Sequence, residues 1–333
     1  MGRVFVCGDI HGASDISKLW GISWPEGRSL SRDDHLIILG DFGLIWSDPA
    51  AKDAAFWLDW LECRPWTTLF IDGNHENHDL IDALPVSEWQ GGKVHVLPDH
   101  PHLIHLMRGQ AYTSDSHGTW FTMGGARSQD RQWRTEGRTW WSREMPSDEE
   151  YETALASLER IAWQPDYVFT HDCPSSLLRH AMPWFLSHPE YTPETDRLTD
   201  FLQYADDHLD HRHLRRWYSG HYHHDTVLGN DPTHVVLFRQ IVELGDLPVV
   251  PAASDDFIPG VGRPPLEVPQ TPATVREREQ ATEEQMAIFV RDRLKLAEEP
   301  TTLDYERQQI FRRWLRARRA KDLMARGPHA DVL

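Results

Sequence analysis

Apolar and polar positions follow two different patterns over residues 1 to about 245. Short apolar runs bounded by glycine, aspartate or asparagine are typical of buried strands, whereas apolar residues that recur with the helical period predict amphipathic helices. Strands are expected at residues 3–8, 35–40, 67–72, 94–97, 103–107, 110–114, 119–124, 166–170, 215–219, 225–229 and 234–239. Helices are expected at residues 51–63, 76–83, 148–162, 174–180 and 195–209.

The order of these elements predicts the fold class. Strands and helices alternate early in the chain, and strands follow one another more densely later. This order favours an α/β fold of layered sandwich type over a single parallel sheet. Ser147, three residues before Glu150, forms a capping box that marks the start of the third expected helix.

The composition changes after the last expected strand. Residues 248–272 contain seven prolines and few large apolar residues, which is typical of an extended linker. Residues 273–298 and 302–326 have helical patterns, and residues 303–326 carry an apolar stripe opposite a basic face. This helix either docks on its own domain or associates with a second copy or a partner. The expected domains are therefore 1–247, a linker 248–272 and a helical extension 273–333.

Charge and cysteine content narrow the function classes. The 333 residues carry a formal net charge of −18, which argues against a general affinity for nucleic acid but not against phosphate substrates. No run of about 18 apolar residues exists, and the first residues lack the pattern of a signal peptide. Three widely separated cysteines suit a reducing compartment. We therefore expect a cytoplasmic enzyme that does not associate with membranes.

Polar patches follow five of the expected strands. Each combines a small residue with carboxylate, amide or imidazole side chains, and strand ends far apart in sequence meet at one edge of a sheet. The patches are Asp9-Ile10-His11, Gly40-Asp41, Gly73-Asn74-His75-Glu76, Thr170-His171-Asp172 and Gly220-His221-Tyr222-His223. Two divalent ions need a bridging carboxylate and several further ligands each. Carboxylate, amide and imidazole together suit Mn, Fe or Zn better than Ca or Mg.

In this order, the patches resemble the motifs of the calcineurin-like metallophosphoesterase superfamily, which read DxH, GD, GNH(D/E), H and GHxH. The resemblance covers about residues 1–240 and implies a four-layer sandwich of two mixed β-sheets flanked by helices, followed here by a helical C-terminal arm. It implies that Asp9, His11 and His223 hold one metal ion, that Asp41 bridges, and that Asn74, His171 and His221 complete the other site. Two ions, Mn first and Fe or Zn as alternatives, are expected.

The resemblance also implies a reaction. A metal-bridging hydroxide would attack phosphorus in line, and His75 would protonate the leaving oxygen or stabilise the transition state. Asp172 is a candidate for orienting His171 or His221.

The second motif departs from that of Ser/Thr protein phosphatases, GDxxDRG. Leu44 stands where those enzymes have the aspartate that pairs with the histidine of GNH, so His75 lacks that partner unless Asp48 or Asp72 replaces it. With GDIHG, GDFG, GNHE, H and GHxH motifs, the chain is more similar to a bacterial and phage-type group of phosphoesterases.

A segment rich in arginine and tryptophan indicates the substrate. Its arginines are spaced to share one face of a helix, and guanidinium groups bind phosphate while tryptophan rings stack on bases. The candidate substrate-binding residues are Arg127, Arg131, Arg134 and Arg138. In the alternative, this segment is a surface loop whose arginines pair with Asp130, Glu136 and Glu144.

These observations predict a dinuclear-metal-dependent hydrolase of phosphoric esters that acts on a small phosphorylated or nucleotide-like substrate. A phosphoprotein phosphatase is the alternative within the same chemistry. A third interpretation is a non-catalytic protein of this fold that binds a partner through the C-terminal arm. A nuclease is disfavoured by the acidic charge.

Overall fold

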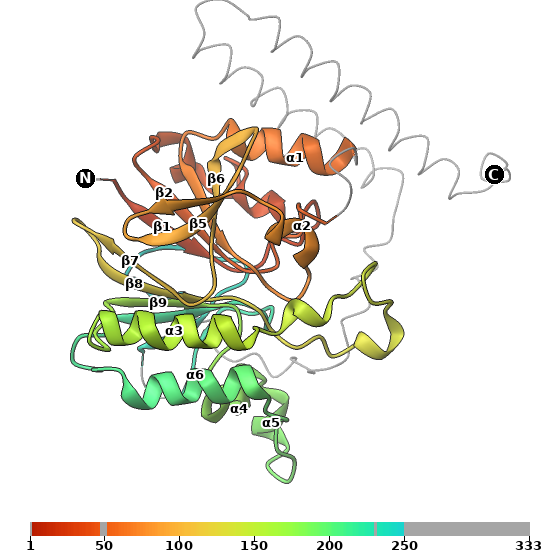
Figure 1. The fold of residues 1–333 in the computed structure, drawn as a ribbon, viewed down its shortest axis with the longest axis vertical. Coiled ribbons are helices and arrows are strands. Elements are labelled where there is room, and N and C mark those ends of the chain that lie inside the picture. Colours follow the sequence, from red (N-terminus) through yellow and green to blue (C-terminus); the bar gives the residue numbers. More distant parts are fainter. Residues whose placement is uncertain (1, 47–51, 230–231, 250–333) are drawn as a thin grey trace, which may run out of the picture. The chain divides into compact units, whose positions relative to one another are not determined.

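Two mixed β-sheets and the helices packed on them form the part of the chain that the structure describes (Figure 1). The structure is a computed structural model that describes residues 2–46, 52–229 and 232–249, all within one compact unit. The first sheet contains, in spatial order, β13 (Ile241–Glu243), β1 (Val4–Cys7), β2 (His35–Leu39), β3 (Thr67–Ile71), β6 (His100–Leu106), β5 (Gly92–Leu97) and β4 (Val86–Trp89). The second contains β11 (Thr226–Val227), β12 (His234–Val236), β10 (Arg216–Ser219), β9 (Tyr167–Thr170), β8 (Gly118–Met123) and β7 (Gln110–Ser114).

The central strands of both sheets are parallel. β1, β2, β3 and β6 run in one direction, as do β8, β9, β10 and β12 in the other sheet, and antiparallel strands lie at the edges. Parallel strands leave their carboxyl ends on the same edge of a sheet. The turns after β1, β2, β3, β9 and β10 can therefore meet, and these are the turns that carry the polar patches.

Helices of two types, α-helices and short 3-10 turns, connect the strands. The α-helices are α1 (Lys52–Glu62), α2 (His78–Asp82), α3 (Asp148–Arg160), α4 (Leu178–Ala181), α5 (Trp184–Ser187) and α6 (Arg197–His208). The 3-10 turns are η1 (Ile16–Leu19), η2 (Pro25–Ser29), η3 (Arg131–Trp133), η4 (Ser142–Glu144) and η5 (Ser175–Leu177). The capping box at the start of α3 is confirmed, since Ser147 Oγ accepts from the Glu150 amide and the Glu150 carboxylate accepts from the Ser147 amide. No described helix has the length and apolar character needed to cross a bilayer.

Apolar side chains fill the space between the two sheets and outside the second one. The inner cluster takes residues from both sheets, among them Val6, Ile37, Leu69, Phe169 and Tyr218. A second cluster joins α3 and α6 to β8, β9 and β10 through side chains such as Leu158, Leu202 and Trp217. Helix α1 packs against β3 and β6 of the first sheet. Burial on both faces explains why the parallel strands read as continuous apolar runs.

The expected strands are present, with shifted ends, and two further strands were missed. β4 is exposed along most of its length and carries Ser87 and Glu88, so it lacks an apolar signal. β13 has only three residues and pairs with β1 at an edge. The helix expected at 174–180 is wrong in its bounds, because the structure has η5 followed by α4 there.

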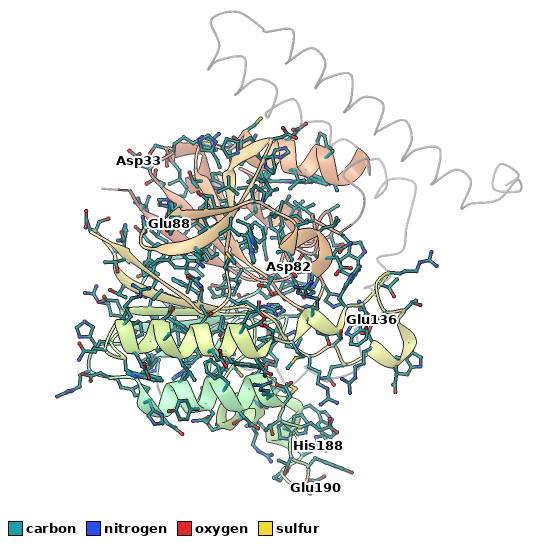
Figure 2. The ribbon with its side chains drawn as sticks, viewed as in Figure 1. Asp33, Asp82, Glu88, Glu136, His188 and Glu190 are labelled. Carbon is teal, nitrogen blue, oxygen red and sulfur yellow. The ribbon has the colours of Figure 1, made fainter. Side chains whose placement is uncertain are left out.

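The arginine and tryptophan segment is not helical, which corrects the expectation of a shared helical face. Between β8 and α3 the chain forms a loop with only the short turns η3 and η4. Figure 2 shows the part of this loop that carries Glu136 extending away from both sheets. The helices expected at 273–298 and 302–326, and the arm 303–326, lie outside the described residues, as does the linker beyond residue 249.

Candidate metal centre

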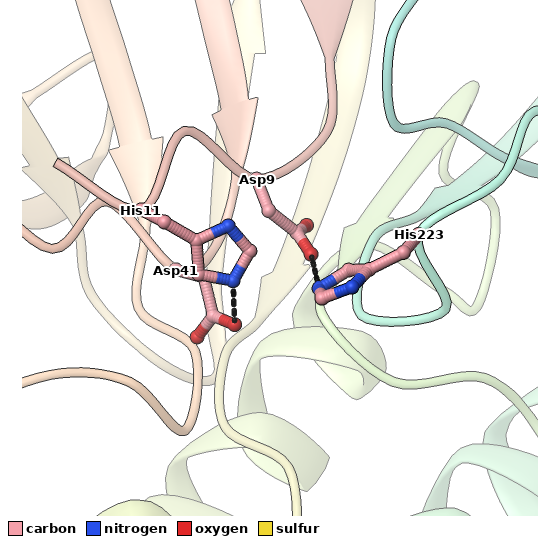
Figure 3. A group of neighbouring side chains, drawn as sticks. All are labelled: Asp9, His11, Asp41 and His223. Atoms are coloured by element: carbon pink, nitrogen blue, oxygen red, sulfur yellow. Dashed lines mark ion pairs between the residues drawn. The ribbon is translucent and has the colours of Figure 1, made fainter. Parts of the chain in front are cut away.

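The five polar patches meet at one place, between the carboxyl ends of the two sheets. Side chains from the turns after β1, β2 and β10 form one group whose potential ligand atoms all lie within 4.8 Å of one another: Asp9, His11, Asp41 and His223 (Figure 3). A second group under the same limit contains Asp41, His171 and His221. The structure therefore brings the sequence-predicted ligands together, and Asp41 belongs to both groups.

Asp41 offers a different oxygen to each group. His11 Nε2 lies 3.2 Å from Asp41 Oδ2, and His171 Nε2 lies 3.4 Å from Asp41 Oδ1. Asn74 joins the second group, because its Oδ1 lies 3.2 Å from the same nitrogen of His171. In the first group, His223 Nε2 lies 3.3 Å from Asp9 Oδ2. A carboxylate placed in this way can bridge two ions.

The two groups differ in their access to solvent. The side chain of His171 is fully buried, whereas that of His223 is 52 % exposed and that of His11 is 19 % exposed. The first group is therefore the more exposed of the two, although His221 of the second group is also partly exposed.

Four of the predicted ligands have a backbone conformation that side-chain-bearing residues rarely adopt. The φ angles are +43° for His11, +45° for Asp41, +67° for His221 and +55° for His223. Left-handed φ values outside glycine are uncommon and concentrate at functional sites, where the surrounding structure compensates for the strain. Strain repeated at four ligands indicates that the turns are shaped for the position of these side chains.

Two glycines allow the turns to approach closely. A Cβ atom on Gly73 would lie 2.2 Å from Asp41 Oδ1, and one on Gly40 would lie 2.2 Å from His171 Nδ1. Gly40 also has a φ of +90°. Side chains at these positions would occupy the space that the ligand atoms fill.

Two buried carboxylate oxygens support the fit of this site to cations. Asp9 Oδ2 and Asp41 Oδ2 are buried and accept no hydrogen bond, although an imidazole nitrogen lies 3.3 Å and 3.2 Å away, respectively. Buried oxygens without partners are costly, and divalent ions bound by carboxylate and imidazole would satisfy them. The mixed donor set fits Mn, Fe or Zn.

The histidines and carboxylates of this site shift one another's pKa values. Burial alone would lower the pKa of His171, but the adjacent Asp41 carboxylate raises it to about 10. Burial likewise opposes charge on His11, yet the hydrogen bond to Asp15 and the nearby charge of Asp41 raise its pKa to about 10. Burial would raise the pKa of Asp41, but His171 and His11 hold it well below its usual range. At neutral pH, protonated imidazoles therefore balance the buried carboxylates.

His75 lies at the edge of this site and is held from two sides. Its amide donates a 2.7 Å hydrogen bond to Asp41 Oδ1, and its ring lies 5.6 Å from that of His11, between centroids. Arg134 Nη1 donates to His75 Nδ1 over 3.2 Å. Burial lowers the pKa of His75 to about 4. A neutral imidazole that accepts at Nδ1 carries its proton on Nε2.

Asp72 does not replace the carboxylate partner that His75 is expected to lack. Asp72 accepts from Arg108 Nε over 2.8 Å and lies 3.1 Å from His105 Nε2. Asp48 lies outside the described residues. The guanidinium of Arg134 lies next to His75 Nδ1 instead.

The four candidate substrate arginines divide into different environments. Arg134 contacts His75 and forms a 2.7 Å ion pair with Asp130, as the loop alternative predicted. Arg127 pairs with Glu194 over 3.2 Å. Arg131 and Arg138 are exposed. Only Arg134 is placed against a residue of the metal centre by a contact in the structure.

Sequence patterns gave no role to several residues that shape the site. Glu76 is buried and accepts from the amides of Phe42 and Gly43, over 2.6 Å and 3.1 Å, which holds the turn of Asp41. Asp15 accepts from His11 Nδ1 over 2.9 Å, and its position four residues after His11 could have indicated this. Asp172 does not orient a histidine; it accepts from the Tyr222 hydroxyl and the Cys173 amide.

Neither a protein-family model nor a curated protein sequence matches this chain. The resemblance to metallophosphoesterases therefore stays a prediction from the motifs.

Proposed function

We propose that this chain is a metal-dependent hydrolase of phosphoric esters that binds two divalent ions, with Mn as the first choice. The observation that carries the proposal is the position of Asp41, whose two oxygens face two separate groups of imidazole ligands. Sites of this composition catalyse in-line displacement at phosphorus in phosphatases and nucleases. The proposal includes the four-layer metallophosphoesterase sandwich, which the packing of helices on both sheets supports.

The chain's own residues would divide the work as follows. Asp9, His11 and His223 would hold one ion, and Asn74, His171 and His221 the other, with Asp41 between them. When bound, the ions would act as Lewis acids on a phosphoryl oxygen and activate water. These assignments agree with the donor types at the site and with the unsatisfied oxygens of Asp9 and Asp41.

His75 and Arg134 would act on the leaving group and the phosphoryl charge. His75 carries its proton on Nε2 if Arg134 donates to Nδ1, so it would offer a hydrogen bond or a proton to the leaving oxygen. Arg134 fixes this ring, and its remaining donors would contact a phosphate oxygen. A small phosphorylated or nucleotide-like substrate is the proposed class.

Two thiols, Cys7 and Cys173, are buried and not in disulfides, which agrees with a cytoplasmic location.

Metal removal and replacement test this function. The full chain, treated with a chelator and then supplied with Mn²⁺, should regain hydrolysis of an aryl phosphate or of the matching diester. D41N should lose this activity while a D115N control on the surface keeps it. Absence of Mn²⁺ binding together with absence of Mn²⁺-stimulated hydrolysis would contradict the proposal.

Leaving-group dependence tests His75. H75A should slow hydrolysis of phenyl phosphate much more than that of nitrophenyl phosphate, because a poor leaving group needs the proton. Equal losses with both substrates would remove His75 from this role while leaving the metal-dependent reaction intact. Activity confined to phosphopeptides in a panel of esters would instead favour a phosphoprotein phosphatase.

A further inference from the structure

The loop between β8 and α3 contacts the metal centre from a second direction, through two buried polar residues. Ser128 and Glu144 lie near its two ends, 2 % and 1 % exposed. Ser128 Oγ donates to Glu144 Oε2 over 2.5 Å, and the Ser128 amide donates to Glu144 Oε1 over 2.9 Å. The Glu144 carboxylate therefore closes the loop on itself.

The same hydroxyl group contacts a predicted metal ligand. Asn74 Nδ2 donates to Ser128 Oγ over 3.1 Å. A serine hydroxyl has one proton to donate and can accept through its lone pairs. Because the Ser128 hydroxyl donates its proton in the hydrogen bond to Glu144, it can only accept a hydrogen bond from Asn74. The amide nitrogen of Asn74 must then face Ser128, and the amide oxygen must face the other way.

That orientation suits a cation. Asn74 Oδ1 lies 3.2 Å from His171 Nε2, on the side where the second group of ligands converges. A rotated amide would present its NH₂ group there, and a cation would be repelled by it. We propose, on the basis of the function proposed above, that Glu144 and Ser128 are positioning residues that fix the amide of Asn74 for binding of the second metal ion.

The hydrogen-bonded series Glu144, Ser128 and Asn74 is called the relay below. Other contacts fix the loop that carries it and bring Glu144 close to Ser128. Gly125 N donates to Asp72 O over 2.9 Å at the start of the loop. Arg108 donates to the carbonyl oxygens of Arg143 and Glu144 at its end, over 3.0 Å and 3.1 Å. Both ends of the loop are thus fixed beside the end of β3, next to Asn74. The relay is therefore held by hydrogen bonds at both ends of the loop and is not an isolated surface contact.

Binding of Mn²⁺ alone, measured by calorimetry on the full chain freed of metal, tests the relay. We expect S128A to weaken one of two Mn²⁺ affinities by about 10- to 100-fold, the usual effect of removing a partner of a metal ligand. E144Q should weaken the same affinity less, since glutamine retains one acceptor. The double variant should be no weaker than S128A, because the two residues act in series.

The chain offers a matched control at the other end of β2. Ser31 donates through its amide and its hydroxyl to the Asp34 carboxylate, over 2.6 Å and 2.9 Å, but neither residue is near a predicted ligand. S31A and D34N should change thermal stability and leave both Mn²⁺ affinities unchanged. They separate a loss of orientation from a general loss of stability.

The outcomes distinguish the relay from the function on which it rests. Two Mn²⁺ ions bound by the unsubstituted chain, with unchanged affinity in S128A, would overturn the relay and leave the hydrolase proposal standing. No Mn²⁺ binding by the unsubstituted chain would overturn the hydrolase proposal itself. Should S128A fail to fold, E144Q decides: an unchanged affinity in E144Q would overturn the relay.

Discussion

The buried pair of Arg108 and Asp72 gives a stability prediction whose size follows from the structure. Arg108 is 7 % exposed and donates to Asp72 through Nε over 2.8 Å. It also donates to the carbonyl oxygens of Arg143 and Glu144. In R108M, the buried carboxylate of Asp72 would lose its cation, and the carbonyls of Arg143 and Glu144 would lose a donor. Breaking a buried pair in this way costs about 3–5 kcal/mol.

The matched control for R108M is R143M. The Arg143 side chain is 58 % exposed and pairs with Asp82 at the surface, where such a pair contributes about 0–1 kcal/mol. We would compare the free energies of unfolding in urea. The melting temperature of R108M should fall by about 6 to 20 °C, using about 2–4 °C per kcal/mol for domains of this size. A loss of unfolding free energy in R108M no larger than that in R143M would refute the reasoning.

The effect of R108M should also depend on pH in a defined direction. Burial would raise the pKa of Asp72, but Arg108 and His105 hold it well below the ordinary range. A carboxyl group whose pKa is depressed in the folded state stabilises the fold at pH values above its unfolded pKa of about 4. This stabilisation is lost as the pH falls from there toward the folded pKa. In R108M the carboxyl group can take up a proton. The difference between the two proteins should therefore shrink as the solution is acidified.

Three further outcomes are expected. Mn²⁺ affinity should rise with pH over the neutral range, because His11 and His171, each with a pKa of about 10 before metal binds, must release protons to bind metal. Calorimetry at several pH values checks this, and an affinity independent of pH would count against it. R134A should reduce kcat for phenyl phosphate about 100-fold or more, because Arg134 contacts His75. The control R138A, at an exposed arginine, should keep nearly the activity of the unsubstituted chain. Equal losses of kcat in the two variants would disprove the distinction. Y222F should lower the free energy of unfolding by about 1–3 kcal/mol, because Asp172 loses a buried donor, and an unchanged urea midpoint would contradict it.

The sequence predicted which side chains the structure brings together, because each turn has its own local signature. A small residue, a carboxylate, amide or imidazole ligand and a preceding apolar strand are visible within about six residues, and the parallel arrangement of strands brings the turns together. Asp41 and His171 are 130 positions apart by their numbers, and neither is specific by itself; the prediction depended on the order of all five patches. The convergence of the turns depended on the fold class, which the order of strands and helices predicted.

The residues around the ligands could not be predicted in the same way. Asn74 and Ser128 are 54 positions apart, and Ser128 lies in a loop whose path no periodic pattern describes. The spacing of Arg127, Arg131, Arg134 and Arg138 fits a helix, but the loop backbone points them to different surroundings, so spacing could not select Arg134. β4 was missed because an exposed edge strand needs no apolar face.

The distribution of ligands between the two sheets has a consequence for folding. Asp9 and Asp41 follow strands of the first sheet, and His171, His221 and His223 follow strands of the second. The hydrogen bond from the His221 amide to Asp9 Oδ1 joins residues 212 positions apart. Contacts of such long range form late, because closing a long chain segment is entropically expensive. Neither sheet alone can offer a complete ligand set, so metal loading would report that both halves of the chain have folded and assembled.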